Sequence, residues 1–203
     1  MPFRARHLAV GASRRTILAF LAQAVASLPF CAPARAQTDT LIVRPKFSLR
    51  SHRGERMSEA HLQGAPSLVF FGFTSCPDIC PTTLLDITTL YAALGPHADR
   101  LKTYFISVDA ETDTPEILAL YLQSFDPRIV GLTGTEAELE QARRSFLAFA
   151  EKTEGAGGAS WSHTSLIYLM DAAGRFVGPL DLSQGVSIAL KQLQFVLPGV
   201  KLI

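Results

Sequence analysis

The chain of 203 residues is 48% hydrophobic and has a formal net charge of +1, which fits one domain with a substantial core and leaves little room for two. Residues 1–36 contain five arginines and no acidic residue. In residues 37–203, acidic side chains therefore outnumber basic ones. A mildly acidic body without a basic block argues against nucleic-acid binding.

The first 36 residues are typical of an export signal. A basic segment with two adjacent arginines precedes an apolar run over 17–30, and a small-x-small cleavage pattern ends at Ala36. The run is shorter than the roughly 20 residues that span a bilayer. We predict export to the periplasm, by the general or the twin-arginine route, with an uncleaved membrane anchor as the alternative. Residues 37–203 then form a single domain where disulfides persist.

In chain order, the mature sequence alternates short apolar runs with amphipathic segments. The run over 67–73 is almost continuously apolar, which is typical of a strand buried on both faces. A flexible glycine-rich loop is expected over 155–159. Phe149 and Phe195 are each expected to face the core from a predicted helix. The predicted strands cover 41–49, 67–73, 101–108, 129–132, 165–170 and 175–177, and the predicted helices begin at Pro81, Thr114, Thr135 and Ser183. Such alternation predicts an α/β fold, with parallel strands in the sheet and helices on both of its faces.

Two cysteines, Cys76 and Cys80, lie between the strand over 67–73 and the helix after it. Four residues of helix rise about 6 Å and complete about one turn, so both sulfurs would lie near one face if the segment is helical. That spacing suits a disulfide, which needs about 4.4–6.8 Å between Cα atoms, and it also suits two thiolates on one metal ion. A helix N-terminus favours the thiolate form needed for either use. The spacing supports metal binding and redox chemistry about equally, and an inert pair is the structural alternative.

Two further candidates are expected at the same edge of the sheet. Asp109 follows the strand over 101–108, and His163 precedes the strand over 165–170. Ligands of open α/β sheets bind at the carboxyl ends of the strands. Two thiolates and one imidazole suit copper, because sulfur favours Cu(I) and imidazole accommodates Cu(II). A histidine before a strand and an aspartate after one also serve purely structural roles.

The segment Gly72–Pro81, Gly-Phe-Thr-Ser-Cys-Pro-Asp-Ile-Cys-Pro, resembles the signature of the Sco/SenC family. These copper-binding, thioredoxin-like proteins help to assemble the CuA site of cytochrome c oxidase. The resemblance covers about 41–197 and implies a thioredoxin-like fold, with a central mixed sheet and helices on both faces. It continues through Phe105–Asp109, Asp113–Pro115, Val130–Thr135 and His163-Thr164.

The resemblance implies that Cys76, Cys80 and His163 bind copper, as Cu(I) or Cu(II). It also implies that Asp109 helps to position the site or to transfer copper. The chain departs from the family at Ser162, where an aspartate usually precedes the ligand histidine, and at Thr112, where an arginine is common. These changes leave the three ligands in place but bear on partner docking and on the tuning of His163.

We therefore predict a periplasmic metallochaperone, which delivers copper to the oxidase subunit with the CuA site or prepares that site. We do not expect the protein to be an enzyme. Other periplasmic copper chaperones and thiol reductases are further expected partners, and the membrane is expected to be reached only through a partner or an uncleaved leader. The alternative is a thiol–disulfide oxidoreductase whose redox-active pair, Cys76 and Cys80, reduces cysteines of a target protein. A third interpretation is a peroxide-handling enzyme on the same fold.

Overall fold

The computed structural model describes residues 45–155 and 158–200. The predicted export signal over 1–36 and the first part of the strand predicted over 41–49 lie outside these residues. Within the described ranges, no helix is both long enough and apolar enough to cross a membrane.

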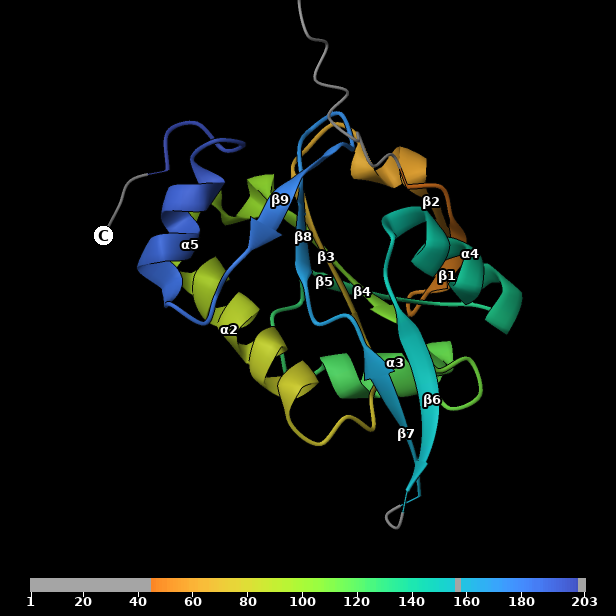
Figure 1. The fold of residues 1–203 in the computed structure, drawn as a ribbon. Helices are drawn as coiled ribbons and strands as arrows, with labels where there is room; N and C mark the ends of the chain where they lie inside the picture. The colour runs from red at the N-terminus through yellow and green to blue at the C-terminus, as the bar shows by residue number, and fades with distance from the viewer. Residues whose placement is uncertain (1–44, 156–157, 201–203) are drawn as a thin grey trace, which may run out of the picture. The chain divides into compact units, whose positions relative to one another are not determined.

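A seven-stranded mixed sheet forms the centre, in the order β2-β1-β5-β4-β3-β8-β9 (Figure 1). Strands β3, β4 and β5 are parallel, whereas β8 runs antiparallel to β3 and β1 antiparallel to β5. The strands are β1 Ser48–Ser51, β2 Arg56–Ser58, β3 Ser67–Gly72, β4 Lys102–Ser107, β5 Ile129–Thr133, β8 Ile167–Met170 and β9 Phe176–Leu180. All six residues of β3 are buried, as its apolar sequence predicts.

Helices cover both faces of the sheet, as predicted. Phe70 and Phe105 lie opposite each other in the register, and the Phe105 ring packs on Tyr121 of α3, with ring centroids 6.1 Å apart. Successive strand residues point to opposite faces, so Phe71 faces the other side, where its ring meets Phe146 of α4 at 5.4 Å. The helices are α2 Ile79–Leu94, α3 Pro115–Leu122, α4 Glu136–Phe146 and α5 Val186–Leu193, with short 3-10 helices at Glu59–Leu62 and Gly95–Arg100.

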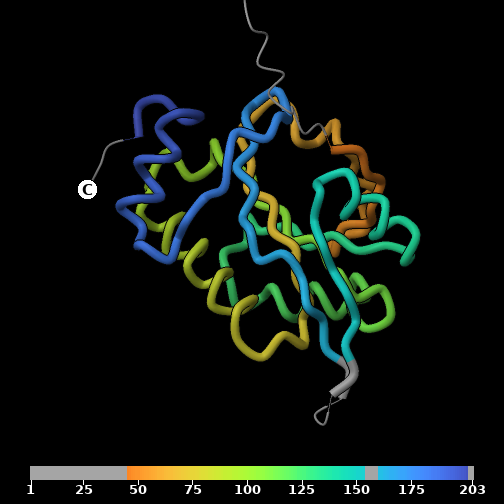
Figure 2. The backbone as a smooth tube through the Cα atoms, viewed as in Figure 1, coloured from red at the N-terminus to blue at the C-terminus, as the bar shows by residue number. Residues whose placement is uncertain are grey.

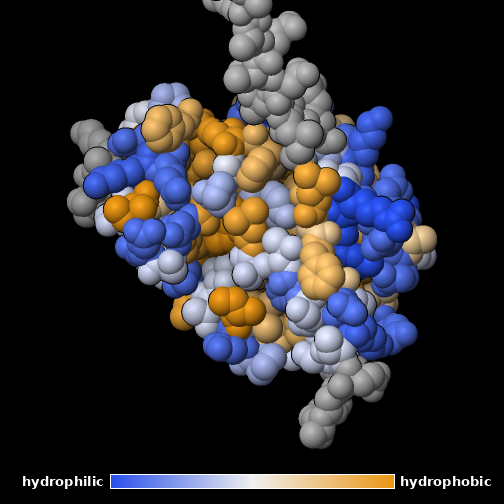
Figure 3. Space-filling model, in the orientation of Figure 1, coloured by the Kyte–Doolittle hydropathy of each residue, from blue (hydrophilic) through white to orange (hydrophobic). Residues whose placement is uncertain are grey.

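Two of the helix starts follow the local signals in the sequence. The Thr114 side chain accepts a hydrogen bond from the backbone of Ile117, and Thr135 forms the predicted capping box with Glu138. The outer surface of α4 is strongly hydrophilic (Figure 3), whereas its inner face is buried against the core. Helix α5 packs beside α2, although the two are far apart in the sequence (Figure 2).

The segment before His163 folds as a hairpin and not as the predicted loop. Strands β6 (Ala150–Gly155) and β7 (Gly158–His163) pair antiparallel in a two-stranded sheet of their own, which projects from the main body (Figure 1). Ala150 lies opposite His163 in this register. Ala150 and Trp161 of the hairpin pack against the main core, but most of its other residues are polar or glycine, so the sequence carries little strand signal there.

Two predicted core residues lie on the surface because their helices end earlier than expected. Helix α4 ends at Phe146, where Leu147 adopts a left-handed backbone with φ of 56°, and Phe149 is 53% exposed. Phe195 follows the end of α5 and is 86% exposed. The spacing of apolar residues continues past both helices, but the regular helices end at Phe146 and Leu193. Helix α5 also begins later than predicted, after Gly185 and not at Ser183.

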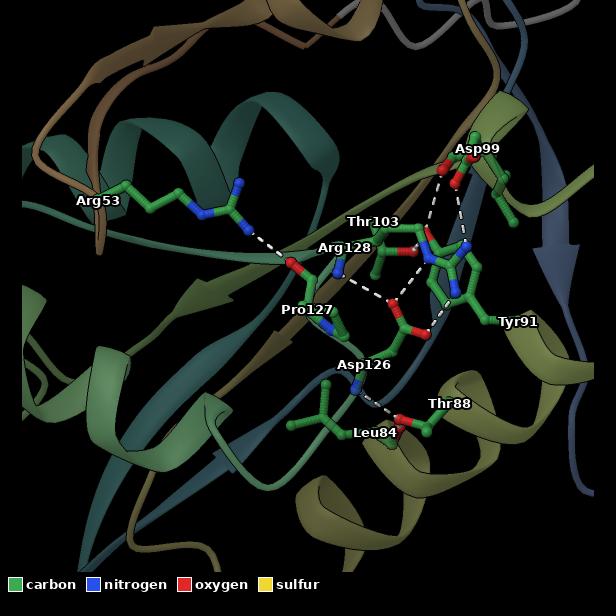
Figure 4. Close-up of polar contacts among 10 residues, drawn as sticks. Arg53, Leu84, Thr88, Tyr91, Asp99, Thr103, Asp126, Pro127 and Arg128 are labelled. Carbon is green, nitrogen blue, oxygen red and sulfur yellow. Dashed lines mark hydrogen bonds and ion pairs between the residues drawn. The ribbon is translucent and has the colours of Figure 1, made fainter.

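A polar cluster links α2 to the start of β5 (Figure 4). The Arg128 guanidinium pairs with Asp126 at 2.7 Å and with Asp99 at 3.1 Å, and it lies 4.5 Å above the ring of Tyr91. The Tyr91 hydroxyl in turn bonds to that of Thr103, at 2.8 Å. Thr103 stands at the amino end of β4, whereas the cysteines follow the carboxyl end of β3. The cluster therefore holds together the end of the sheet that is remote from the cysteines.

Candidate metal centre

The cysteine loop, residues 73–80, connects the end of β3 to the first turn of α2. The Cys76 N–H donates to the carbonyl of Phe73 at 3.3 Å, which closes a turn before the helix begins at Ile79. Cys80 lies in the first turn, and its N–H donates to the Cys76 sulfur at 3.5 Å. Both residues are buried free thiols. The segment between them is thus a turn that leads into a helix, and it brings the two cysteines together at the helix start, as predicted.

His163 joins the cysteines from the end of β7. Its Nε2 lies 3.6 Å from the Cys80 sulfur, although 83 positions separate the two residues. Its Nδ1 lies 3.0 Å from the carbonyl oxygen of Thr164. A carbonyl can only accept a hydrogen bond, so Nδ1 carries the proton and Nε2 presents its lone pair toward the sulfur. A second ring nitrogen fixed in this way is typical of metal-binding histidines.

Aromatic rings hold the His163 imidazole in this orientation. The ring of Phe73 meets it edge-on with centroids 5.7 Å apart, and the ring of Phe70 does so at 6.4 Å. Phe70 belongs to β3 and Phe73 to the cysteine loop, so the elements that position the sulfurs also orient the imidazole.

Burial raises the pKa of the Cys80 thiol, and the neighbouring Cys76 side chain adds to the increase, although a hydrogen bond from the Phe73 backbone opposes it. The sequence-based expectation that the helix N-terminus favours the thiolate is therefore wrong for Cys80 in the metal-free protein. Desolvation outweighs the helix, because Cys80 is completely buried. A bound metal ion deprotonates a coordinating thiol, so the proton would leave Cys80 on metal binding.

Gly72 leaves the space that the Cys80 sulfur occupies. A Cβ atom at this position would lie 2.8 Å from that sulfur and 2.6 Å from Cε2 of Phe105. Both distances are shorter than real Cβ contacts, and neither neighbour is a flexible chain end. The glycine at the end of β3 is thus required by close packing against the site.

We expect Gly72→Ala to destabilise the protein by about 1–3 kcal/mol, the usual cost of overpacking a core, and to displace the Cys80 sulfur. Urea unfolding measures the first effect, and the rate of thiol alkylation in the folded protein measures the second. Gly178→Ala in β9 is the matched control, because a Cβ atom there meets nothing within 4 Å. Equal stabilities of the two variants would contradict this assignment.

Asp113 anchors the cysteine loop, a role that sequence reasoning missed. Its buried carboxylate accepts hydrogen bonds from the Thr74 N–H at 3.1 Å and from the Ser107 hydroxyl at 2.6 Å. The Thr74 hydroxyl also donates to it, at 2.5 Å. Asp113 therefore ties the loop to the end of β4. Its only signal in the sequence was membership of the Asp-Thr-Pro run that resembles the family.

Asp109 lies at the carboxyl end of β4, as predicted, and is buried. Its Oδ1 accepts hydrogen bonds from the N–H groups of Glu111 and Thr112, each at 3.2 Å. The carboxylate thus caps the turn that leads into α3, which is the structural role considered for it. Its part in positioning or transferring a metal stays a prediction.

Cys76, Cys80 and His163 form a donor set that fits copper chemically, with two sulfurs and one imidazole nitrogen. In residues 45–155 and 158–200, however, no three or more His, Cys, Asp or Glu side chains are already gathered closely enough to hold a metal ion. Cys80 and His163 face each other, whereas the Cys76 sulfur is engaged with the backbone of Cys80. Closing the three donors around one ion therefore requires side-chain movement.

Known proteins are similar to this chain over most of its length. A SCO2-like protein of Rickettsia felis is 34% identical over 152 residues, which are 73% of this chain and 74% of that protein. The structure of Bradyrhizobium japonicum ScoI with copper bound is 41% identical, with a TM-score of 0.72, and the match covers 76% of this chain and 99% of that one. This match confirms the predicted thioredoxin-like arrangement of the mixed sheet and its helices.

A more distant structure is that of BsSco, a member of the Sco family of cytochrome c oxidase assembly proteins. It is 28% identical, with a TM-score of 0.56, and the match covers 68% of this chain and 82% of that one. The family model of SCO1/SenC matches residues 35–197, which include the cysteine loop, the Asp113 anchor and the histidine that faces Cys80. The chain therefore belongs to the SCO1/SenC family.

Proposed function

We propose that this protein is a copper metallochaperone that acts in the assembly of cytochrome c oxidase. Cys76, Cys80 and His163 would hold one copper ion as cargo, for delivery to the oxidase subunit with the CuA site or for preparation of that site. The observation that carries the proposal is the imidazole that faces the Cys80 sulfur at 3.6 Å with its other nitrogen fixed. The copper bound by ScoI of B. japonicum supports it.

The proposal includes a place of action and a class of partner. Export to the periplasm would bring the domain to the side of the membrane where the recipient site is assembled. The recipient would be a polypeptide whose own cysteines take over the copper. Thiolate ligands exchange soft metal ions between proteins without releasing them to solvent, so no chemical conversion by an enzyme is required.

A titration of the reduced protein with Cu(I) and Cu(II), in competition with chelators of known affinity, tests the proposal. We expect one copper ion per chain, and we expect the Cys76→Ser/Cys80→Ser double variant to lose most of the binding. Lys102→Ala is a suitable control, because Lys102 bonds to backbone carbonyls at the other end of the sheet. A wild-type protein without stoichiometric copper binding would overturn the proposal.

A thiol–disulfide oxidoreductase is the second candidate, favoured by the two free cysteines in contact through the Cys80 N–H. In this case Cys76 and Cys80 would reduce the cysteines of the target before metallation, and His163 would be dispensable. An oxidase assembly assay in a deletion strain separates the two functions. Restoration by His163→Ala but not by Cys80→Ser would favour the oxidoreductase, whereas failure of both variants supports the chaperone.

A further inference from the structure

The strand pairing at the base of the hairpin β6–β7 departs from a regular antiparallel ladder. Ala150 lies opposite His163, so the next pair outward is Phe149 with Thr164. In a regular ladder, two residues that exchange hydrogen bonds each donate an N–H to the carbonyl of the other. The Thr164 N–H follows this rule and donates to the Phe149 carbonyl at 2.9 Å. The reverse bond is different, because the Phe149 N–H donates to the Thr164 hydroxyl oxygen, also at 2.9 Å.

The hydroxyl oxygen thus takes the place that the Thr164 carbonyl would have in the ladder. The carbonyl accepts instead from Nδ1 of His163, at 3.0 Å. One residue therefore closes the hairpin with its side chain and fixes the imidazole with its backbone. Because Nδ1 holds the proton in this bond, Nε2 presents its lone pair toward the Cys80 sulfur, 3.6 Å away.

A side chain without a hydroxyl could not share the two donors between two acceptors in this way. With valine at position 164, the Phe149 N–H would have the carbonyl of that residue as its acceptor across the hairpin. An amide left without an acceptor costs free energy, so the carbonyl would be drawn into the ladder and away from the imidazole. An imidazole without a fixed partner at Nδ1 populates both tautomers, and in one of them the proton on Nε2 blocks metal binding there.

We propose that Thr164 is a positioning residue of the copper site, whose hydroxyl frees its own carbonyl to hold His163 in the metal-binding tautomer. The inference rests on the proposed copper site and adds a residue that acts on copper through the imidazole. The bonds of Thr164 are formed between protein groups alone. The imidazole is therefore oriented in advance, which lowers the cost of ordering it when the ion binds.

The first test observes the His163 imidazole directly, in the reduced protein without copper. Long-range 1H–15N correlation spectra, recorded where the ring is neutral, should show the Nδ1–H tautomer in wild type and in Thr164→Ser, which keeps the hydroxyl. Thr164→Val should show a mixture of both tautomers. The matched control is Thr153→Val, which removes the bond from the Thr153 hydroxyl to the Ser160 carbonyl in the same hairpin and should keep the wild-type tautomer.

Two outcomes of these spectra overturn the inference. The first is a wild type in which the Nε2–H tautomer predominates, a result that needs no variant to fold. The second is a Thr164→Val protein with the same tautomer as wild type.

Chelator competition measures what this orientation contributes to copper binding. We expect Thr164→Val to bind Cu(II) about 10-fold more weakly, at the lower end of the usual cost of losing a partner of a metal ligand, because the carbonyl itself remains. The affinity for Cu(I) should change less, since both sulfurs are unaltered. Thr164→Ser and Thr153→Val should bind both ions as wild type does.

The pattern of affinities separates a positioning role from a merely structural one. Equal weakening for the two ions in Thr164→Val, or failure of Thr164→Ser to keep the Cu(II) affinity, overturns the inference and leaves the proposed function intact. A wild type that shows the expected tautomer but binds no copper overturns the proposed function, whereas the orienting of His163 by Thr164 then stands.

Discussion

His163→Ala should lower the affinity for Cu(II) by at least about 100-fold, more than the 10- to 100-fold lost when only a partner of a ligand is removed. The affinity for Cu(I) should fall less, because the two sulfurs that favour Cu(I) remain. The physical reason is that His163 Nε2, the nitrogen that faces the Cys80 sulfur, would be the imidazole donor of the proposed set. Chelator competition with each oxidation state, under anaerobic conditions for Cu(I), measures both affinities.

The control for this experiment is His61→Ala. The ring of His61 is exposed and accepts a hydrogen bond from the backbone of Ser58, at 3.0 Å, so its loss should leave copper binding unchanged. Thermal unfolding of His163→Ala checks that the variant is still folded, so that a loss of binding is not caused by a loss of structure. Equal Cu(II) affinities of His163→Ala and wild type would show that the copper site is built from other donors.

Asp113→Ala should destabilise the protein by about 3 kcal/mol or more, because each buried donor left without its acceptor costs about 1–3 kcal/mol. The Thr74 N–H, the Thr74 hydroxyl and the Ser107 hydroxyl all lose their acceptor in this variant. The cysteine loop should also become mobile, so copper binding should weaken. Urea unfolding and hydrogen exchange at the loop amides measure these effects.

The control for Asp113 is Asp99→Ala. Asp99 pairs with Arg128 at the surface, where its side chain is 89% exposed, and such pairs contribute little to stability. Asp113→Asn keeps the shape and one acceptor oxygen, so its loss of stability should lie between those of Asp113→Ala and Asp99→Ala. Equal stability of Asp113→Ala and wild type would contradict the role of this carboxylate as the anchor of the loop.

The same carboxylate should give the stability of the protein a particular pH dependence. Burial raises the pKa of Asp113, although hydrogen bonds from Ser107 and Thr74 oppose the increase. The folded protein therefore holds this proton to a higher pH than the unfolded chain does. The contribution of Asp113 to stability should be largest below the ordinary carboxyl pKa and should fall as the pH rises through the raised value. The difference in unfolding free energy between wild type and Asp113→Asn, measured across this range, isolates that contribution.

Short-range signals in the sequence determined much of the fold and identified the donors. The buried strand β3, the caps at Thr114 and Thr135, and the two cysteines at a helix start are each encoded within a few consecutive residues. Hydrogen bonds and packing over one or two turns decide such features, so periodicity and residue type predict them. The resemblance, which begins at Gly72–Pro81 and extends to His163-Thr164, indicated the family and predicted the copper ligands.

Only the tertiary structure decided how the site is assembled. The contact of Cys80 with His163 spans 83 positions and that of Thr74 with Asp113 spans 39, and both depend on how distant strands pair. The hairpin that ends in His163 has few apolar residues, and the helices before Phe149 and Phe195 end without a proline or glycine to mark the place. The raised pKa of Cys80 arises from burial, which is a property of the packed core and not of the neighbouring residues in the chain.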